Sequence, residues 1–403
     1  MLPGASWVES NQQQLVAALA DVRDHLEGRP ARAVPAAGDS ALAVLCDIFK
    51  LTRFERALLL LCAGVELNSA FAPLCASLNG DPASAYPTFS LALARLPDPH
   101  WSALSPEGAL RRWLLIDVVR QPGVPLTTSP LRIDERILHY LTGLNHTDER
   151  VVNLTEPLGA GGLVAASHDS IVASVCEEWS PGRALTAIQL CGRDAGAKRD
   201  IAAAAASALR ISFFVLHADM LAARANDFEL LARVWDREAA LSSAALYVET
   251  DGLDAETPGL VRRLVERVSA PVIVSTPEAW ALRRATRIFD VAKPPASEQR
   301  ELWTRFLGPE SEAAGEDVDR VAGQFDLGAV AIRAAALEAR GASGAALGER
   351  MWDAARARAR THLGQLAQLV RSDVTFADLV LPERNTAMLH EIAVHVARRP
   401  TVY

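Results

Sequence analysis

The sequence has little lysine, no closely spaced cysteine pair and no long apolar run. Only three of its 41 basic residues are lysine, at positions 50, 198 and 293. The five cysteines form no Cys-x-x-Cys pair, so we expect reduced, mostly buried thiols. The N-terminus lacks the basic and apolar regions of a signal peptide, and the longest apolar run, 57–65, is too short to span a bilayer. These absences favour a cytoplasmic protein with no membrane partner.

The composition is that of an ordinary globular protein. Half of the 403 residues are apolar and 22% are charged, which provides ample material for hydrophobic cores. A chain of this length is expected to form two or three domains. The net charge of −8 argues against a nucleic-acid contact along the whole chain, although a local basic patch is compatible with it.

A strand, loop and helix pattern at residues 186–209 resembles a phosphate-binding loop. An apolar run leads to Gly192, and four residues separate it from Ala197, Lys198 and Arg199. The phosphate-loop pattern is Gly, four residues, Gly, Lys and then Ser or Thr, between a strand and a helix. One of the few lysines therefore occupies the position of the phosphate-loop lysine. The residues that we predict to bind nucleotide are Gly192, Asp194, Gly196, Ala197, Lys198 and Arg199.

Two substitutions in this loop weaken the expected chemistry. Ala197 replaces a glycine at a tightly folded backbone position, and Arg199 replaces the hydroxyl that would ligate Mg²⁺. An arginine cannot ligate a metal and adds positive charge where the cation would lie. We therefore expect ATP or ADP as ligands, doubt that Mg²⁺ binds, and expect no hydrolysis. An ordinary strand–turn–helix with a Gly-rich turn explains the loop equally well.

Two later apolar strands end in polar residues. Residues 244–248 precede Glu249 and Asp251, which are the candidates for a degenerate Walker B motif, although a buried strand ending in a polar loop is the simpler interpretation. Residues 271–276 resemble the strand that carries a nucleotide sensor, which makes Ser275 or Thr276 the sensor candidate. No confident catalytic residue or metal ligand follows from these patterns.

Three arginines follow, at positions 283, 284 and 287, and we place them on a helix. They are either an arginine finger for a neighbouring subunit or, more simply, a solvated charged face. A helical lid is predicted to end near Gly341, followed by a long exposed helix with alternating Arg356, Arg358 and Arg360.

The first 150 residues contain the outline of a winged-helix unit. An amphipathic helix is predicted at 10–28, a Pro- and Ala-rich linker at 29–38, and an apolar helical region at 41–67, with Thr52 and Glu55 as a capping box. A helix from Ser105 to Trp113, strands at 114–119 and 131–133, and a helix that begins at Asp134 follow. The candidate recognition helix offers little beyond Arg111 and Arg112, so protein docking is favoured over DNA binding.

Four segments together resemble the N-terminal part of a bacterial AAA-family ATPase of the two-module type. They are LTRFERALLLLCAGVELNSAF (51–71), SPLRIDERILHYLTGLN (129–145), GRDAGAKRD (192–200) and FADLVLPERNTAMLHEI (376–392). This family has a winged-helix N-terminal region, a degenerate first AAA module and an intact second one, and it often accompanies contractile injection systems. The resemblance implies that the protein forms a ring with other AAA subunits, which in such proteins is usually a hexamer. It also implies a protein substrate or an injection-system component as a partner.

The predicted fold class is therefore mixed α and α/β. We expect a helical and winged-helix domain at 1–153, and a degenerate P-loop AAA module at 156–374 whose α/β core ends near 292 and precedes the helical lid. Residues 375–403 would be the opening segment of a second AAA module, absent here, that hydrolyses ATP for protein remodelling. The chain itself would supply docking and ring-assembly surfaces. The alternatives are a winged-helix DNA-binding regulator whose degenerate module senses nucleotide, and a structural assembly subunit without a ligand.

Overall fold

The computed structural model describes residues 5–30, 39–159, 161, 164–180, 182, 186–219, 221, 227–251, 257–341, 345–359 and 375–397. The remainder lies outside the described residues. It includes most of the predicted linker, Arg360 and the predicted domain limits at 374 and 403. The chain divides into two compact units. One comprises Met1–Glu156, Phe214–Leu246 and Asp254–Pro271, and the other Pro157–Phe213, Tyr247–Leu253 and Val272–Tyr403.

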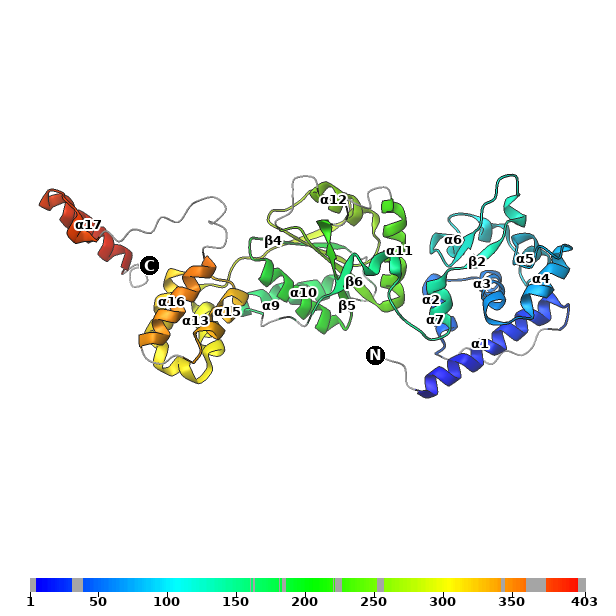
Figure 1. Ribbon diagram of the computed structural model, residues 1–403, viewed down its shortest axis with the longest axis horizontal. Coiled ribbons are helices and arrows are strands. Elements are labelled where there is room, and N and C mark those ends of the chain that lie inside the picture. Colours follow the sequence, from blue (N-terminus) through cyan, green and yellow to red (C-terminus); the bar gives the residue numbers. More distant parts are fainter. Residues whose placement is uncertain are drawn as a thin grey trace. The chain divides into compact units, whose positions relative to one another are not determined.

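The N-terminal part of the first unit is a helical domain with a small antiparallel sheet (Figure 1). Its central helix α3 begins after Thr52, whose side chain and that of Glu55 form the predicted capping box. The buried apolar side chains of α3 lie at the centre of this core. The helices are α1 (Ala5–Leu26), α2 (Ala41–Phe49), α3 (Arg53–Leu67), α4 (Phe71–Asn79), α5 (Phe89–Arg95), α6 (Ala109–Arg112), α7 (Glu135–Leu141) and α8 (Glu149–Val152), with short 3-10 turns at Trp101–Leu104 and Leu126–Thr128.

Strands β1 (Ile116–Val118) and β2 (Leu131–Ile133) pair antiparallel, with Ile116 opposite Ile133 and Asp117 opposite Arg132. Each strand turns its two end residues inward and its middle residue to solvent, as the period of two in a strand requires. The predicted helix from Ser105 to Trp113 is wrong in length, since α6 has only one turn. The backbone folds tightly before α6, where a Cβ at Gly108 would lie 2.7 Å from the carbonyl oxygen of Ser102.

Helix α11 (Phe228–Ser242) belongs to the same unit and joins it through a buried network of charges. Arg136 donates from Nε to Glu238 Oε2 at 3.0 Å, and both side chains are only 3% exposed. Arg237 is fully buried and forms ion pairs with Asp148 and with Asp134, the latter at 3.1 Å. Buried charges are costly unless they are paired, so this network fixes α11 in one position.

The α/β region contains a six-stranded sheet with the strand order β3-β5-β6-β7-β4-β8. Strand β4 pairs in parallel with β7 and with β8, and Cys191 at its end is opposite Thr276 and Asp290. Strands β4 and β7 are buried along their whole length, which explains why most of their residues are apolar. The elements are β3 (Thr155–Pro157), α9 (Asp169–Glu178), β4 (Ala187–Cys191), α10 (Ala195–Leu209), β5 (Ser212–His217), β6 (Ala244–Glu249), α12 (Thr257–Arg267), β7 (Val272–Thr276) and β8 (Thr286–Asp290), with a 3-10 turn at Ala166–His168.

The helix predicted to carry Arg283, Arg284 and Arg287 is wrong. Arg287 lies on β8, and the residues before it are not helical. The side-chain amide of Gln189 on β4 holds the backbone of Trp280 at both its N–H and its carbonyl, at 2.8 and 2.9 Å. These bonds draw the segment along β4, where its backbone completes a strand ladder instead of a helix.

A helical bundle follows the sheet in the second unit (Figure 1). It consists of α13 (Ala296–Leu307), a 3-10 segment (Gly308–Ala314), α14 (Gly315–Gln324), α15 (Ala329–Ala339) and α16 (Ala345–Ala359). The prediction of a separate, exposed helix after Gly341 is wrong, because α16 buries Leu347 and Met351 against α15. Arg356 and Arg358 lie on its outer side and pair with Asp353 and Glu338.

The last described elements are a 3-10 turn at Phe376–Asp378 and α17 (Glu383–Ala397), which begins after Pro382 as predicted. Several of their apolar side chains are exposed, including Val380 and Ile392. All five cysteines are free thiols. Among the described residues no single helix has the length and apolar character needed to cross a membrane, although the pair α3 and α4, bent by 120°, meets the criteria of length and composition together.

Candidate nucleotide site and its internal ion pairs

The predicted nucleotide-binding residues lie at the end of β4 and in the first turns of α10. Only three residues connect Cys191 of β4 to Ala195 of α10. Gly192 has a φ of +143°, and a Cβ there would lie 2.2 Å from the carbonyl oxygen of Val291. Glycine is therefore required at this turn, where the chain passes close to the segment after β8.

Asp194 caps α10 and uses backbone groups that a phosphate loop would present to its ligand. Its Oδ1 accepts a hydrogen bond from the backbone N–H of Ala197 at 3.0 Å, and its carbonyl accepts one from Lys198 N–H at 3.2 Å. A helix N-terminus attracts anions, and here the carboxylate of the chain itself is the anion. The helix thus begins within the stretch that the phosphate-loop pattern assigns to the loop.

The lid covers this helix end. A Cβ at Gly328, which precedes α15, would lie 1.7 Å from Asp194 Oδ2. Val330 of α15 lies against Gly196, where an added Cβ would be 2.8 Å from its Cγ2. Asp194 Oδ2 is buried and has no hydrogen-bond partner. The Asp194 carboxylate therefore lies between the first turns of α10 and α15, and Gly328 provides the space for it.

Lys198 is fully buried, and all of its protons have internal acceptors. Its Nζ lies 2.9 and 3.0 Å from the two carboxylate oxygens of Asp251, 2.7 Å from Gly192 O and 3.0 Å from Thr276 O. Asp251 also accepts a hydrogen bond from Ser275 Oγ at 2.8 Å. The structure thus brings together Lys198, one Walker B candidate and both sensor candidates.

Arg199 forms the second ion pair of the site. Its Nη1 lies 3.2 Å from Glu249 Oε1 and 3.4 Å from Oε2, and both side chains are about one-third exposed. Arg199 occupies the helix position of the hydroxyl that would ligate Mg²⁺, and Glu249 ends the neighbouring strand β6. The positive charge that Mg²⁺ would bring next to this carboxylate is already supplied by the guanidinium.

The residues present do not fit a magnesium ion. Two carboxylates of the site, Glu249 and Asp251, are paired with cationic side chains. Within the described ranges of the chain, no group of three or more His, Cys, Asp or Glu side chains is placed to hold a metal. Mg²⁺ needs several oxygen ligands in a near-octahedral arrangement. Glu249 and Asp251 face competing cations, and the remaining carboxylate, that of Asp194, caps α10 and is enclosed between α10 and α15.

The fit to a nucleotide phosphate is also poor. The Lys198 ammonium is already neutralised, and the Ala197 N–H is bonded to the cap. Asp194 was among the predicted site residues, but its role as a helix cap was not predicted. The proximity of Gly328 and Val330 to the site was not predicted either. The signal for the cap was present, since Asp followed by an alanine-rich run marks a helix start. Nothing in the sequence pointed to the two lid residues, because their proximity is a product of tertiary folding.

Two regions of the chain match models of known protein families. Residues 5–155 match the family model described as "Winged helix domain, variant", and residues 295–361 match the one described as "Contractile injection system ATPase helical domain". The first match confirms the winged-helix region predicted from the sequence. The second agrees with the predicted resemblance to ATPases that accompany contractile injection systems.

Among the solved structures that resemble the chain are two structures of the FIGL-1 AAA domain and one of Rhizobiales Trip13. The FIGL-1 AAA domain in complex with ADP is 16% identical, covering 62% of this chain and 97% of its own, with a TM-score of 0.39. A second structure of the FIGL-1 AAA domain is 13% identical over 61% and 96%, also at 0.39, and Rhizobiales Trip13 is 18% identical over 46% and 82%, at 0.29. No curated protein matches the chain.

Proposed function

We propose that residues 157–359 form an AAA module that does not hydrolyse ATP and serves as an assembly and docking module of a contractile injection system ATPase. The proposal rests on two ion pairs at the end of the sheet. Lys198, at the phosphate-loop lysine position, is bound to Asp251, and Arg199, at the metal-ligand position, is bound to Glu249.

Opening the site to a phosphate costs free energy, because internal contacts must break. For a phosphate to reach Lys198, the fully buried lysine would have to leave Asp251, and this partly buried carboxylate would lose its cationic partner. Breaking a buried ion pair costs about 3–5 kcal/mol. The Asp194 cap and the α15 residues against it would also have to move. A nucleotide therefore competes with three sets of contacts that the chain makes with itself.

In this proposal the module contributes surfaces rather than chemistry. Its partners are other AAA subunits in an oligomer, and a protein substrate or injection-system component. ATP hydrolysis for protein remodelling belongs to a second AAA module, as the family resemblance implies, and residues 375–397 are the opening segment of that module. The exposed apolar side chains of α17 are consistent with a segment that packs elsewhere in the full assembly.

The experiment is nucleotide binding and turnover by the purified chain. We expect the wild type to show no Mg²⁺-dependent binding of a fluorescent ATP analogue and no hydrolysis above background. Lys198→Met tests the site, and Lys50→Met is its matched control, since Lys50 is an exposed lysine that pairs only with Asp47. Hydrolysis that requires Mg²⁺, is lost in Lys198→Met and persists in Lys50→Met would refute the proposal.

A further inference from the structure

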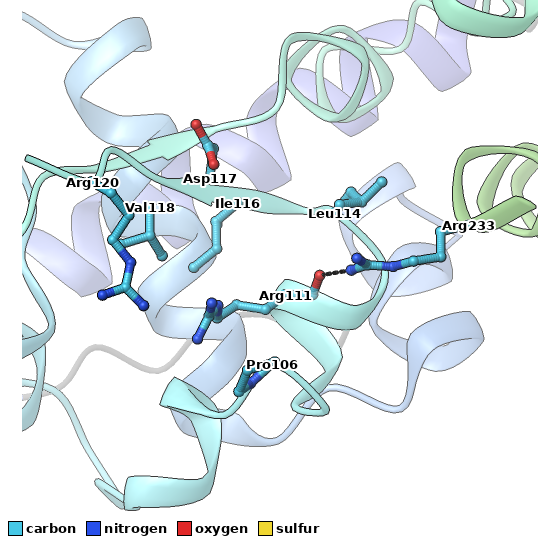
Figure 2. Close-up of a pocket in the computed structure, with 8 residues that line it drawn as sticks. All are labelled: Pro106, Arg111, Leu114, Ile116, Asp117, Val118, Arg120 and Arg233. Carbon is cyan, nitrogen blue, oxygen red and sulfur yellow. Dashed lines mark hydrogen bonds between the residues drawn. The ribbon is translucent and has the colours of Figure 1, made fainter. Parts of the chain in front are cut away.

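A small basic pocket lies in the first unit, on the winged-helix region. It has a volume of about 200 Å³ and lies between α6 and β1 (Figure 2). Three arginines line it, together with a single acidic residue, Asp117. Apolar side chains from Pro106, Ile116 and Val118 form its walls. A cavity with cationic groups on apolar walls is suited to an anion that carries a short hydrocarbon stem.

Two guanidinium groups are directed into this pocket. Figure 2 shows the Arg111 and Arg120 side chains reaching the same space beside Ile116 and Val118. Arg111 is held in place because its Nη1 donates a hydrogen bond to Leu104 O at 2.7 Å. Arg120 is exposed, and its side chain makes no hydrogen bond or ion pair with any residue that the structure describes. The pocket thus has one fixed and one adaptable cation.

The third arginine adds charge and stabilises the pocket wall. Arg233 of α11 donates from Nε and Nη2 to the carbonyl of Arg112, at 2.9 and 2.8 Å, and from Nη2 to the carbonyl of Arg111. These bonds hold the end of α6, but carbonyl acceptors do not neutralise the guanidinium. Burial, and then the charges of Arg120 and Arg233, lower the pKa of Arg111, as expected where positive charges gather.

The acidic residue of the pocket offsets only a small part of this charge, because the effect of Asp117 on the pKa of Arg111 is upward but is smaller than those of burial, Arg120 and Arg233. Asp117 is the middle residue of β1, so its side chain points to the opposite face from Ile116 and Val118, where Arg132 is its cross-strand neighbour (Figure 2). No ion pair joins Asp117 to an arginine in the part of the chain that is described. The pocket therefore retains a net positive charge on a chain whose overall charge is −8.

We propose that this pocket binds the carboxylate of a glutamate or aspartate side chain from an acidic segment of a partner protein. Guanidinium groups match the geometry of a carboxylate, and the apolar walls would pack against its methylene groups. A DNA contact fits less well, because α6 has only four residues and the chain is acidic overall. The inference specifies a docking site and does not depend on the state of the nucleotide site.

The test is binding of a fluorescently labelled polyglutamate peptide to the full chain, with a polyglutamine peptide and a duplex DNA oligonucleotide as comparison probes. We expect the polyglutamate peptide to bind and to weaken as salt is added, because the contact is charged. Arg111→Gln and Arg120→Glu should each weaken binding by about tenfold or more, the size of one charge-assisted hydrogen bond. Arg132→Gln, on the opposite face of the same small sheet, is the matched control and should bind like the wild type.

Each other outcome would overturn the inference. Wild-type protein that binds no polyglutamate, or variants that bind it as well as the control, would show that the pocket takes no carboxylate. Tighter binding of the DNA duplex, lost in the same two variants, would reassign the pocket to phosphates. Arg120→Glu keeps the test valid if Arg111→Gln unfolds, because the exposed Arg120 side chain holds no other residue in place. ATP binding is measured separately and does not enter this test.

Discussion

At the scale of single residues, the state of Lys198 governs the candidate site. A lysine ammonium is strongly hydrated, and burial of one without a partner is among the most costly changes in a protein. Lys198 avoids this cost through one carboxylate and two strand-end carbonyls. The lysine is therefore a structural residue of the core, whatever its ancestral role at a phosphate.

Removal of either member of this pair should destabilise the fold. We expect Lys198→Met to lower the free energy of unfolding by about 3–5 kcal/mol, because it leaves the Asp251 carboxylate unpaired next to buried carbonyls. Asp251→Asn should cost at least as much, because it leaves the fully buried Lys198 ammonium without its anionic partner, whereas the Asp251 carboxylate left by Lys198→Met is 25% exposed to water. The double variant should cost less than the sum, by about 1–3 kcal/mol, which urea unfolding of all four proteins measures as a coupling energy.

The pair formed by Arg199 and Glu249 serves as the internal comparison. Its side chains are 38% and 34% exposed, so Arg199→Gln should change stability by less than about 1 kcal/mol. A loss for Arg199→Gln as large as that for Lys198→Met, or additive effects of Lys198→Met and Asp251→Asn, would contradict this account of the site.

At the scale of elements, α11 is held by charges rather than by apolar contact alone. Asp148 has the central position, between Arg150 and the fully buried Arg237. Burial raises the pKa of Asp148, but the hydrogen bonds and charge of Arg150, with the charge of Arg237, outweigh it and hold the pKa below its usual 3.8. The folded state thus favours the ionised carboxylate.

This shift predicts a specific dependence of stability on pH. Because the folded pKa is below the unfolded value, the contribution of Asp148 is fully present above pH 3.8 and is lost as the pH falls through the folded pKa. Glu238 opposes this trend: burial raises its pKa above 4.5. We therefore expect Asp148→Asn to destabilise the protein near neutral pH, and the difference from wild type to shrink below pH 3.8. Urea unfolding of both proteins across this pH range measures it, and a constant difference would contradict it.

Local features were predictable, and tertiary ones were not. The Thr52 and Glu55 capping box and the helix start after Asp134 were read from the sequence because capping is a contact between near neighbours. The buried strands β4, β6 and β7 were predicted from their apolar runs. The segment around Arg287 was assigned to a helix because nothing in its own composition indicates that Gln189 anchors it beside β4.

The candidate site, too, was predictable from the sequence only in its local features. The positions of Gly192, Lys198 and Arg199 were predicted because a loop motif is defined by spacing. Their partners Asp251 and Glu249 were also singled out, but as candidates for a degenerate Walker B motif and not as ion-pair partners of Lys198 and Arg199. The contact of Gly328 with Asp194 links positions more than a hundred residues apart, and no local pattern encodes it.

At the scale of the whole molecule, the proposal of a non-hydrolytic module predicts how the protein responds to nucleotide. A protein that binds a ligand only when folded gains stability with ligand concentration, by about 2.7 kcal/mol at a hundredfold excess over the dissociation constant. We expect ATP, with or without Mg²⁺, to leave the unfolding temperature of the wild type unchanged. Asp251→Asn, which removes the internal anion, is the informative comparison, and any ATP-dependent rise should be larger there. A rise in the wild type that Lys198→Met abolishes would contradict this expectation.

The Asp194 carboxylate between α10 and α15 has a consequence for how such a module would behave in a cell. Nucleotide-binding modules sample open and closed lids as the ratio of ATP to ADP changes. In this module the anion between the two helices is the Asp194 carboxylate, which belongs to the chain itself. Its local concentration is therefore fixed and does not depend on a ligand in solution. We expect the lid of such a module to be insensitive to the energy state of the cell, so that in the proposed oligomer it would offer neighbouring subunits a constant surface against which a moving module can work.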